Sequence, residues 1–350
     1  MLTTRLMFEY CWDEAMHNEI VFSSRQGRKV WNTLDRIAHN YDQEKTPLEL
    51  ENVAHNLLKD IMDDSVLRKI SAVSDNNTMS HVVVRNFLSI KSLPLTPTDD
   101  NSPDTSGWRI PATALLGLLR LSGHSARSFL DEMNGRLCHM VMPAKNNEKS
   151  FIRSTKKLGF HTEVVNGYFY EENPIPGKPV SPDVFGLLGL RNPDGIATTL
   201  IPLDSVLNNL TPDVIEALMK PQFSAISQSS FDREIMINNI SVLTKLSGGG
   251  MGLRYSHSKI TADNSEAAKA LQALADEISH SEHVMQVVLN PGDALILNNR
   301  TCVHGRGAIT GTQKFDGMDR WLIRIYGYKF STLPMLKTLP DKKHVIMVDM

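Results

Sequence analysis

Gly159-Phe160-His161-Thr162-Glu163 is the stretch on which the interpretation of this chain depends, together with residues 290–306, which read NPGDALILNNRTCVHGR. A histidine and a carboxylate two residues apart project from the same side of a strand, so His161 and Glu163 can reach one ion. His304, in the second stretch, would be the third ligand. Two imidazoles and one carboxylate leave half of an octahedron open, which suits a non-haem Fe(II) oxygenase that also holds a co-substrate and oxygen.

The composition is that of an ordinary globular protein. The chain has 350 residues, of which 41% are hydrophobic and 22% are charged, and its formal net charge is −2. This length suits one large domain, and we predict a single domain over residues 1–350. Lys and Arg number 37 against 39 Asp and Glu, so the basic excess expected of a nucleic-acid-binding protein is missing.

Cysteine content and hydropathy predict the compartment. The chain has only three cysteines, Cys11, Cys138 and Cys302, without paired spacing, which argues for reduced thiols and against a Cys-ligated zinc. The first ten residues lack an apolar run of secretory length, and no stretch of about 18 apolar residues could span a bilayer. We therefore expect a cytoplasmic protein with no membrane partner.

Hydrophobic periodicity predicts a mainly β fold with flanking helices. Residues 12–75 show apolar spacings of three and four, which indicate two or three amphipathic helices that form an N-terminal layer. Short strand-like runs follow at residues 184–190, 196–201, 284–289, 293–297 and 321–328. The first two runs flank an Asn-Pro-Asp-Gly turn and are expected to pair as a hairpin. Residues 222–240 lack clear periodicity and are interpreted as a lid.

A His-x-acid pair alone is weak support for a metal site, so the flanking sequence matters. His304 follows a Pro-Gly-Asp turn and an apolar strand, which places it at a strand end. Downstream, Arg320 and Arg324 share one face of a strand, and a guanidinium among apolar residues normally has a carboxylate partner, which a dicarboxylate co-substrate would provide. A catalytic zinc would more often show three histidines or a His-Glu-x-x-His helix, and neither occurs. The alternative is a β-sandwich with incidental histidines.

Several ordered motifs make the chain similar to a known family. They are LPLTPT at 93–98, NGRLCHMVMP at 134–143, GFHTE at 159–163, LLGLRNPDGIATT at 187–199, NNRTCVHGR at 298–306 and DRWLIR at 319–324. With these motifs the chain resembles the clavaminate synthase-like Fe(II)/2-oxoglutarate-dependent oxygenases. Within that group it looks most like the bacterial hydroxylases of free amino acids such as arginine, lysine and asparagine.

The resemblance implies a fold and a metal site. It implies a double-stranded β-helix (jelly-roll) core, which we place at residues 80–330 with the lid around 222–240, and a helical N-terminal layer, which we place at 12–75. It also implies that His161, Glu163 and His304 bind Fe(II).

The resemblance also implies how the co-substrate 2-oxoglutarate is held, with O2 as the second co-substrate. The keto-acid end would chelate the iron. Arg320 would pair with the distal carboxylate, helped by a hydroxyl from Thr199 or Thr198. Arg324 would support this carboxylate or touch the substrate.

The function implied is hydroxylation at C3 or C4 of a free polar L-amino acid for natural-product biosynthesis, with release of succinate and CO2. Residues 253–257 offer no carboxylate for a guanidinium, so arginine is less favoured than lysine or a neutral polar amino acid unless Glu171, Glu172 or Asp232 reaches in from a flanking loop. Lysine is narrowly favoured, because a single mobile acid on a loop is enough for its compact ammonium group. An oxygenase of carrier- or peptide-bound substrates is an alternative. Another is a non-catalytic or cupin-like metal-binding β-helix protein.

Overall fold

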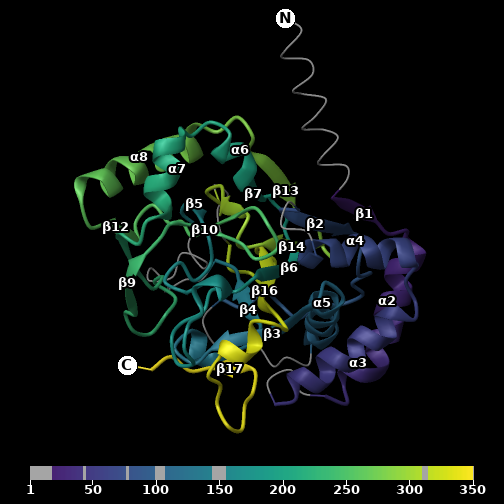
Figure 1. Cartoon of the computed structure of the whole chain (residues 1–350). Coiled ribbons are helices and arrows are strands. Elements are labelled where there is room, and N and C mark those ends of the chain that lie inside the picture. Colours follow the sequence, from purple (N-terminus) through teal and green to yellow (C-terminus); the bar gives the residue numbers. More distant parts are fainter. Residues whose placement is uncertain are drawn as a thin grey trace, which may run out of the picture.

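Two β-sheets lie face to face at the centre of the molecule, and helices cover the outer side of each (Figure 1). The computed structural model describes residues 18–41, 45–75, 79–98, 107–143, 155–309 and 314–349. The larger sheet has the strand order β1-β2-β14-β6-β16-β3-β17, and β4 also pairs with β16. Its strands are β1 (Glu19–Val21), β2 (His81–Arg85), β3 (His124–Phe129), β4 (His139–Val141), β6 (Val184–Arg191), β14 (Ala294–Asn298), β16 (Trp321–Lys329) and β17 (Val345–Ile346).

The smaller sheet has the order β13-β7-β15-β5 and is antiparallel throughout. Its strands are β5 (Leu158–His161), β7 (Ala197–Pro202), β13 (Met285–Val288) and β15 (Cys302–Arg306). From β13 to β16 the chain alternates between the two sheets, strand by strand. This arrangement is a jelly-roll core, and it confirms the predicted mainly β fold with flanking helices.

Strand β6 reads as a continuous apolar run because both of its faces are buried. Leu188 and Leu190 face the helices on the outer side of the larger sheet, whereas Phe185 and Leu187 point into the core between the sheets. Leu200 of β7 and Leu295 of β14 meet them in that inner core. Side chains alternate along a strand, so a strand covered on both faces must be apolar at every position.

One helical layer covers the outer face of the larger sheet, seen at the right of Figure 1. Its helices are α2 (Ser24–Ala38), α3 (Pro47–Lys59), α4 (Asp64–Asp75) and α5 (Arg109–Leu121). Ser23 and Gln26 form a reciprocal capping box at the start of α2. The predicted N-terminal helices are confirmed over α2 to α4, while residues 12–17 lie outside the described residues.

Helix α5 packs closely on the middle of the larger sheet. A Cβ on Gly186 of β6 would lie only 2.8 Å from Leu115 Cδ1, so a larger residue there would force the Leu115 side chain to shift. Leu115 is itself fully buried. The close fit makes α5 the main cover of the sheet.

A second helical layer lies over the smaller sheet, with its own apolar cluster. Its helices are α6 (Leu203–Leu207), α7 (Pro212–Met219) and α8 (Ser265–His280), and its strands are β8 (Phe223–Ile226), β9 (Met236–Ile240), β10 (Leu243–Lys245), β11 (Met251–Leu253) and β12 (Ile260–Ala262). The segment 222–240, interpreted as a lid, contains the antiparallel strands β8 and β9. Its connecting residues, 227–235, turn back toward the sheets. No helix within the described ranges is long and apolar enough to cross a membrane.

The predicted hairpin of residues 184–190 and 196–201 is wrong. Both strands form, as β6 and β7, but β6 pairs with β14 and β16, and β7 pairs with β13 and β15. Asn192 instead folds the connection into a turn, with its side chain accepting from Ile196 N and donating to Leu289 O. The turn sends the chain from one sheet to the other.

Removing the Leu115 side chain should destabilise the protein strongly. We expect Leu115→Ala to lower the free energy of unfolding by about 2–5 kcal/mol, because a cavity remains between α5 and β6. Urea denaturation followed by circular dichroism measures this change. Leu95, which is 66% exposed, is the matched control, and Leu95→Ala should change stability by less than about 0.5 kcal/mol. Equal effects of the two substitutions would contradict this packing.

Candidate functional site

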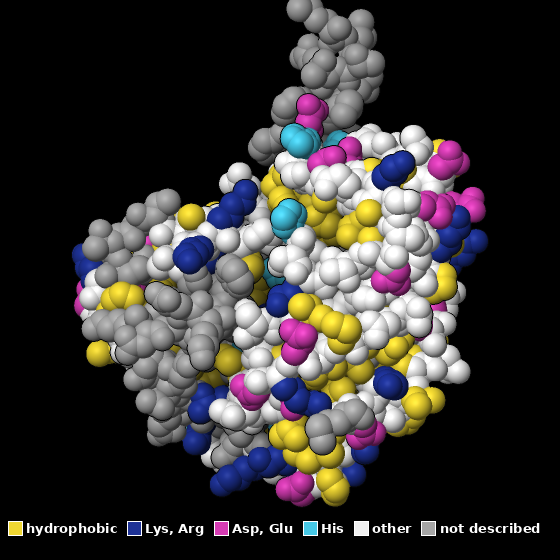
Figure 2. All heavy atoms as spheres, turned by 90° about the vertical axis from the view of Figure 1, so that its left-hand side faces the viewer, with side chains coloured by type: hydrophobic (Ala, Val, Ile, Leu, Met, Phe, Trp, Pro, Cys, Tyr) yellow, Lys and Arg dark blue, Asp and Glu magenta, His cyan; other side chains and the backbone are white. Residues whose placement is uncertain are grey.

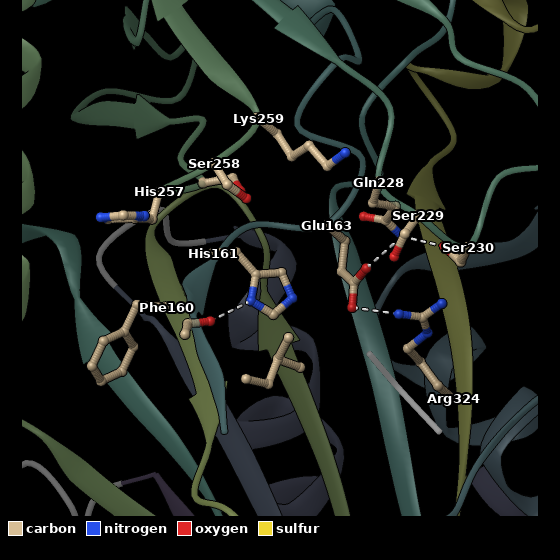
Figure 3. A pocket seen from close by; sticks show the side chains of 13 residues that line it. Phe160, His161, Glu163, Gln228, Ser229, Ser230, His257, Ser258, Lys259 and Arg324 are labelled. Carbon is tan, nitrogen blue, oxygen red and sulfur yellow. Dashed lines mark hydrogen bonds and ion pairs between the residues drawn. The ribbon is translucent and has the colours of Figure 1, made fainter. Parts of the chain in front are cut away.

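The predicted metal ligands meet where β5 and β15 pair. His161 is the last residue of β5, and it lies directly opposite His304 of β15 in the antiparallel register. Glu163 follows in the turn after β5. One candidate ligand atom from each of these residues lies within 4.8 Å of the others, and the two imidazole rings are 4.2 Å apart between centroids. Figure 3 shows His161 and Glu163 side by side at the base of the pocket.

Local contacts orient these side chains for a cation. His161 Nδ1 lies 2.8 Å from Gly159 O and donates to it, so Nε2 is left facing the site. Burial, and then the nearby His304, lower the pKa of His161 to about 4, so the imidazole is neutral at pH 7. Burial would raise the pKa of Glu163, but Arg324 and the imidazoles outweigh it and hold that pKa well below its usual range. Neutral imidazoles and an ionised carboxylate are the forms that bind a metal ion.

Arg324 ties Glu163 into a buried polar network beneath the pocket. Its Nη1 lies 2.6 Å from Glu163 Oε1, and its Nη2 lies 3.1 Å from Glu132 Oε1. Tyr326 donates to Glu163 Oε2, and Gln228 Nε2 donates to both carboxylates. Glu132 Oε2 is buried, and no described residue donates a hydrogen bond to it. This oxygen is a candidate acceptor for a ligand.

Asn299 clamps the backbone of Glu163. Its Oδ1 accepts from Glu163 N at 2.7 Å, and its Nδ2 donates to Glu163 O at 3.0 Å and to Pro182 O at 3.0 Å. The next residue, Val164, has a φ of 51°, a left-handed conformation that is unfavourable for a β-branched side chain. The clamp holds the chain in this conformation, which fixes the direction of the Glu163 side chain.

A narrow pocket next to Glu163 and His304 contains the predicted co-substrate residues. Arg320 and Thr198 line it, and Arg306 lines it too while donating to Lys156 O. Thr199 is the neighbour of Thr198 on β7, where successive side chains point to opposite faces, and it does not line this pocket in the described chain.

The buried guanidinium of Arg320 has N–H groups available to bind an anion. It is only 2% exposed, and its Nε and Nη1 have no hydrogen-bond partner among the described residues. Burial, and then the charge of Arg306, lower the pKa of Arg320 to about 9. A buried guanidinium without a partner is costly, and a carboxylate in this pocket would remove that cost.

The larger pocket opens above His161 and Glu163 and has a volume of about 260 Å³. It is lined by Leu158, Gly159, Phe160, His161, Glu163, Gln228, Ser229, Ser230, Ser256, His257, Ser258, Lys259 and Arg324. Figure 2 views the molecule from the left-hand side of Figure 1, and histidine side chains lie at and inside a hollow of this face. The two pockets meet at Glu163 and Arg324. The candidate metal site thus joins a narrow cationic pocket to a wider one.

Comparison with models of known protein families identifies the family of this chain. Residues 139–326, more than half of the chain, match the model of the family described as "Taurine catabolism dioxygenase TauD, TfdA family". The chain belongs to this family. The matched segment runs from β4 to β16 and includes all of the candidate metal and co-substrate residues.

Individual relatives agree with this assignment. An L-ornithine/L-arginine 3-hydroxylase of Catenulispora acidiphila is 26% identical over 221 residues, which cover 55% of this chain and 60% of the relative. An L-asparagine oxygenase of Streptomyces coelicolor is 27% identical over 240 residues, which cover 67% of this chain and 66% of the relative. The matches thus span about three fifths to two thirds of the relatives' lengths.

A solved structure shows the same fold. It is an asparagine oxygenase in complex with Fe(II), 2S,3S-3-hydroxyasparagine and succinate, with a TM-score of 0.79 and 23% identity. The superposition covers 95% of this chain and 100% of that one.

Sequence reasoning missed several side chains that the fold brings to the site. Glu132, Gln228 and Tyr326 lie in the network beneath the pocket, and Lys259 lines its wall. Asn299 belongs to the motif at residues 298–306, but the neighbouring sequence did not indicate that its side-chain amide hydrogen-bonds to the backbone of Glu163. The motif was the only signal that could have identified Asn299 as a site residue.

Loss of the Asn299 clamp should weaken metal binding. We expect Asn299→Ala to lower the affinity for Fe(II) by about 10- to 100-fold, because removing a group that orients a metal ligand typically has this effect. Anaerobic isothermal titration calorimetry with Fe(II) measures the affinity.

Asn298→Ala is the control, since Asn298 accepts from Arg300 N and donates to Met79 O. It should affect stability but leave the Fe(II) affinity within about threefold of the wild type. Unchanged Fe(II) affinity in Asn299→Ala would disprove the role of the clamp.

Proposed function

We propose that the protein is an Fe(II)- and 2-oxoglutarate-dependent oxygenase that hydroxylates an unactivated C–H bond of a free α-amino acid. One molecule of O2 is consumed, one oxygen atom enters the product and the other enters succinate, and CO2 is released. The observation that carries this proposal is the meeting of the His161, Glu163 and His304 side chains beside a pocket that the buried Arg320 also lines. Membership of the TauD/TfdA family supports it.

His161, Glu163 and His304 would hold Fe(II). Two imidazoles and a carboxylate form the donor set of non-haem Fe(II) oxygenases, which leaves positions open for co-substrates. The bound iron would supply the oxidising chemistry, in which 2-oxoglutarate is decarboxylated and the C–H bond is cleaved. The protein's own part is to place both organic molecules and to keep Glu163 ionised.

2-Oxoglutarate would occupy the narrow pocket. One end of this pocket lies at Glu163 and His304, and Arg320 and Thr198 line it as well. A linear dicarboxylate can thus present its keto-acid end to the metal and its distal carboxylate to Arg320. The planar guanidinium can bind that carboxylate through two parallel hydrogen bonds. Thr198, and not Thr199, would add a hydroxyl.

The amino-acid head group would bind over the buried network. Arg324 lines the larger pocket and carries the positive charge that an α-carboxylate requires. Glu132 Oε2, buried and without a donor among the described residues, could accept from the α-ammonium group. The α-carboxylate and α-ammonium groups of an amino acid would thus each meet a group of opposite charge, Arg324 and Glu132. Arg324 thus supports, as the proposed substrate, a free amino acid with an ionised α-carboxylate.

The lysine preference expected from the sequence lacks its acidic partner. Glu171 is within 3.4 Å of Arg300, and Glu172 is paired with Arg254. Among the described lining residues of the larger pocket, none is Glu171, Glu172 or Asp232. A lysine side chain would thus meet no free carboxylate there. The natural-product setting stays a prediction from the resemblance.

Turnover tests the proposal directly. With Fe(II), 2-oxoglutarate and O2, a mass-spectrometric screen of the twenty common amino acids should find one that gains one oxygen atom while succinate forms in equal amount. His304→Ala should abolish this turnover and weaken Fe(II) binding, because one of the three ligands is lost. A His304→Ala variant with full activity and normal Fe(II) affinity would rule out the assigned centre. A cupin-like protein without turnover would produce no hydroxylated amino acid.

Substitutions of Arg320 and Arg324 should affect the KM values of different substrates. We expect Arg320→Lys to raise the KM for 2-oxoglutarate by about tenfold or more, since lysine keeps the charge but not the two-pronged hydrogen bonding. Arg324→Lys should raise the KM for the amino acid more than the KM for 2-oxoglutarate, and it should also weaken Fe(II) binding because it disturbs the ion pair with Glu163. Steady-state assays that vary one substrate at a time distinguish the two. The reverse order would make Arg324 the anchor of 2-oxoglutarate.

A further inference from the structure

The wall of the larger pocket includes a single run of residues between β11 and β12, at positions 256–259. The polar side-chain groups of this run are its two serine hydroxyls, the His257 imidazole and the Lys259 ammonium. In Figure 3 the Lys259 side chain extends across the pocket toward Gln228, whereas His257 points away from Glu163. The space above the metal-ligating residues is thus bounded on this side by a positive charge.

This wall is held in place by backbone contacts at both ends. Thr162 N donates to Tyr255 O at 2.8 Å, and Tyr255 N donates to Thr162 Oγ1 at 3.0 Å, which fixes the run to the turn that carries Glu163. At the other end, Ile226 N donates to Lys259 O at 3.0 Å. The Lys259 backbone is therefore fixed relative to the candidate metal site, and its side chain starts from a defined point.

The Lys259 ammonium has no counter-charge in the described part of the chain. The side chain is half-buried, and no described residue forms a hydrogen bond or ion pair with its ammonium. Glu163, the one acidic residue among the described lining residues, is occupied by Arg324 and would be a metal ligand. A ligand with a negative charge would supply the missing partner. An ammonium or guanidinium group would instead be repelled.

We propose that Lys259 is a specificity-determining residue and that the side chain of the amino-acid substrate ends in a carboxylate. This inference rests on the proposed function and narrows its substrate to acidic amino acids, with aspartate and glutamate as the simplest. Arg324 would take the α-carboxylate, and Lys259 would donate to the side-chain carboxylate. The methylene carbons between the two carboxylates would then face the metal ligands.

Steady-state kinetics on the Fe(II)-loaded enzyme test this inference. The probes are aspartate, glutamate, asparagine, glutamine, lysine and arginine, with succinate release and the gain of one oxygen atom as readouts. Three variants are compared with the wild type: Lys259→Met, which removes the charge at similar length, Lys259→Arg, which keeps it, and Lys259→Glu, which reverses it. Lys269→Met, at an exposed position on α8, is the matched control.

We expect the wild type to prefer an acidic amino acid. Lys259→Met should lower kcat/KM for it by about 10- to 100-fold, the effect of losing one charge-assisted hydrogen bond, mostly through KM. Lys259→Arg should retain most of the activity, and Lys259→Glu should shift the ratio of kcat/KM values toward lysine. The KM for 2-oxoglutarate should stay unchanged in all three, and Lys269→Met should behave as the wild type.

Preferred turnover of lysine, arginine or a carboxamide by the wild type would overturn this inference while leaving the proposed function intact. An equal loss for all amino acids in Lys259→Met would also overturn it, because Lys259 would then bind the shared head group. Failure to hydroxylate any amino acid, with Fe(II) and 2-oxoglutarate bound, would instead refute the proposed function itself.

Discussion

The ion pair between Arg324 and Glu163 is the interaction on which the rest of the site depends. Arg324 belongs to β16 of the larger sheet, and Glu163 lies in the turn that follows β5 of the smaller one, so the pair joins the two sheets at the pocket. Both side chains are about 3% exposed. Taking two charges out of water is costly unless further hydrogen bonds satisfy them. Glu132, Gln228 and Tyr326 provide these bonds.

This arrangement sets the charge of the site before any ligand binds. Burial would lower the pKa of Arg324, but Glu163, Tyr326 and Glu132 outweigh it and raise that pKa, so the guanidinium stays charged. Burial lowers the pKa of His139 to about 4, so this neighbour of Arg324 is neutral at pH 7 and contributes no charge. The floor beneath the pocket therefore holds one cation between two carboxylates. A metal cation bound beside Glu163 would meet an ionised carboxylate, because Arg324 and the imidazoles hold the pKa of Glu163 well below its usual range.

The sequence predicted what is encoded locally. The apolar runs became β6, β7, β13, β14 and β16, and the histidine and carboxylate of residues 159–163 lie at one strand end, because period and spacing are local properties. Strand pairing is not local: β6 lies beside β14, more than a hundred residues away, so the expected hairpin failed. Lys259 and Gln228 were not predicted to belong to the site for the same reason. They stand in connections that only tertiary contacts bring to the site.

The acidic residues near the motif were assigned to a substrate from sequence alone, but the fold uses them for another purpose. Phe169 is packed between the guanidinium groups of Arg254 and Arg300, each 4.6 Å from its ring centroid. These arginines take Glu172 and Glu171 as their partners, as a buried guanidinium requires.

These ion pairs tie the proline-rich segment 168–182 to the residues next to β11 and β15. Its last residues, Ser181 and Pro182, accept hydrogen bonds from the amide of Asn299. That same amide holds the backbone of Glu163. The segment 168–182 thus supports the position of a candidate metal ligand, and its residues Glu171 and Glu172 are paired with arginines. Charge selection in the pocket is consequently left to the residues that line it, among which Lys259 carries an unopposed charge within the described chain.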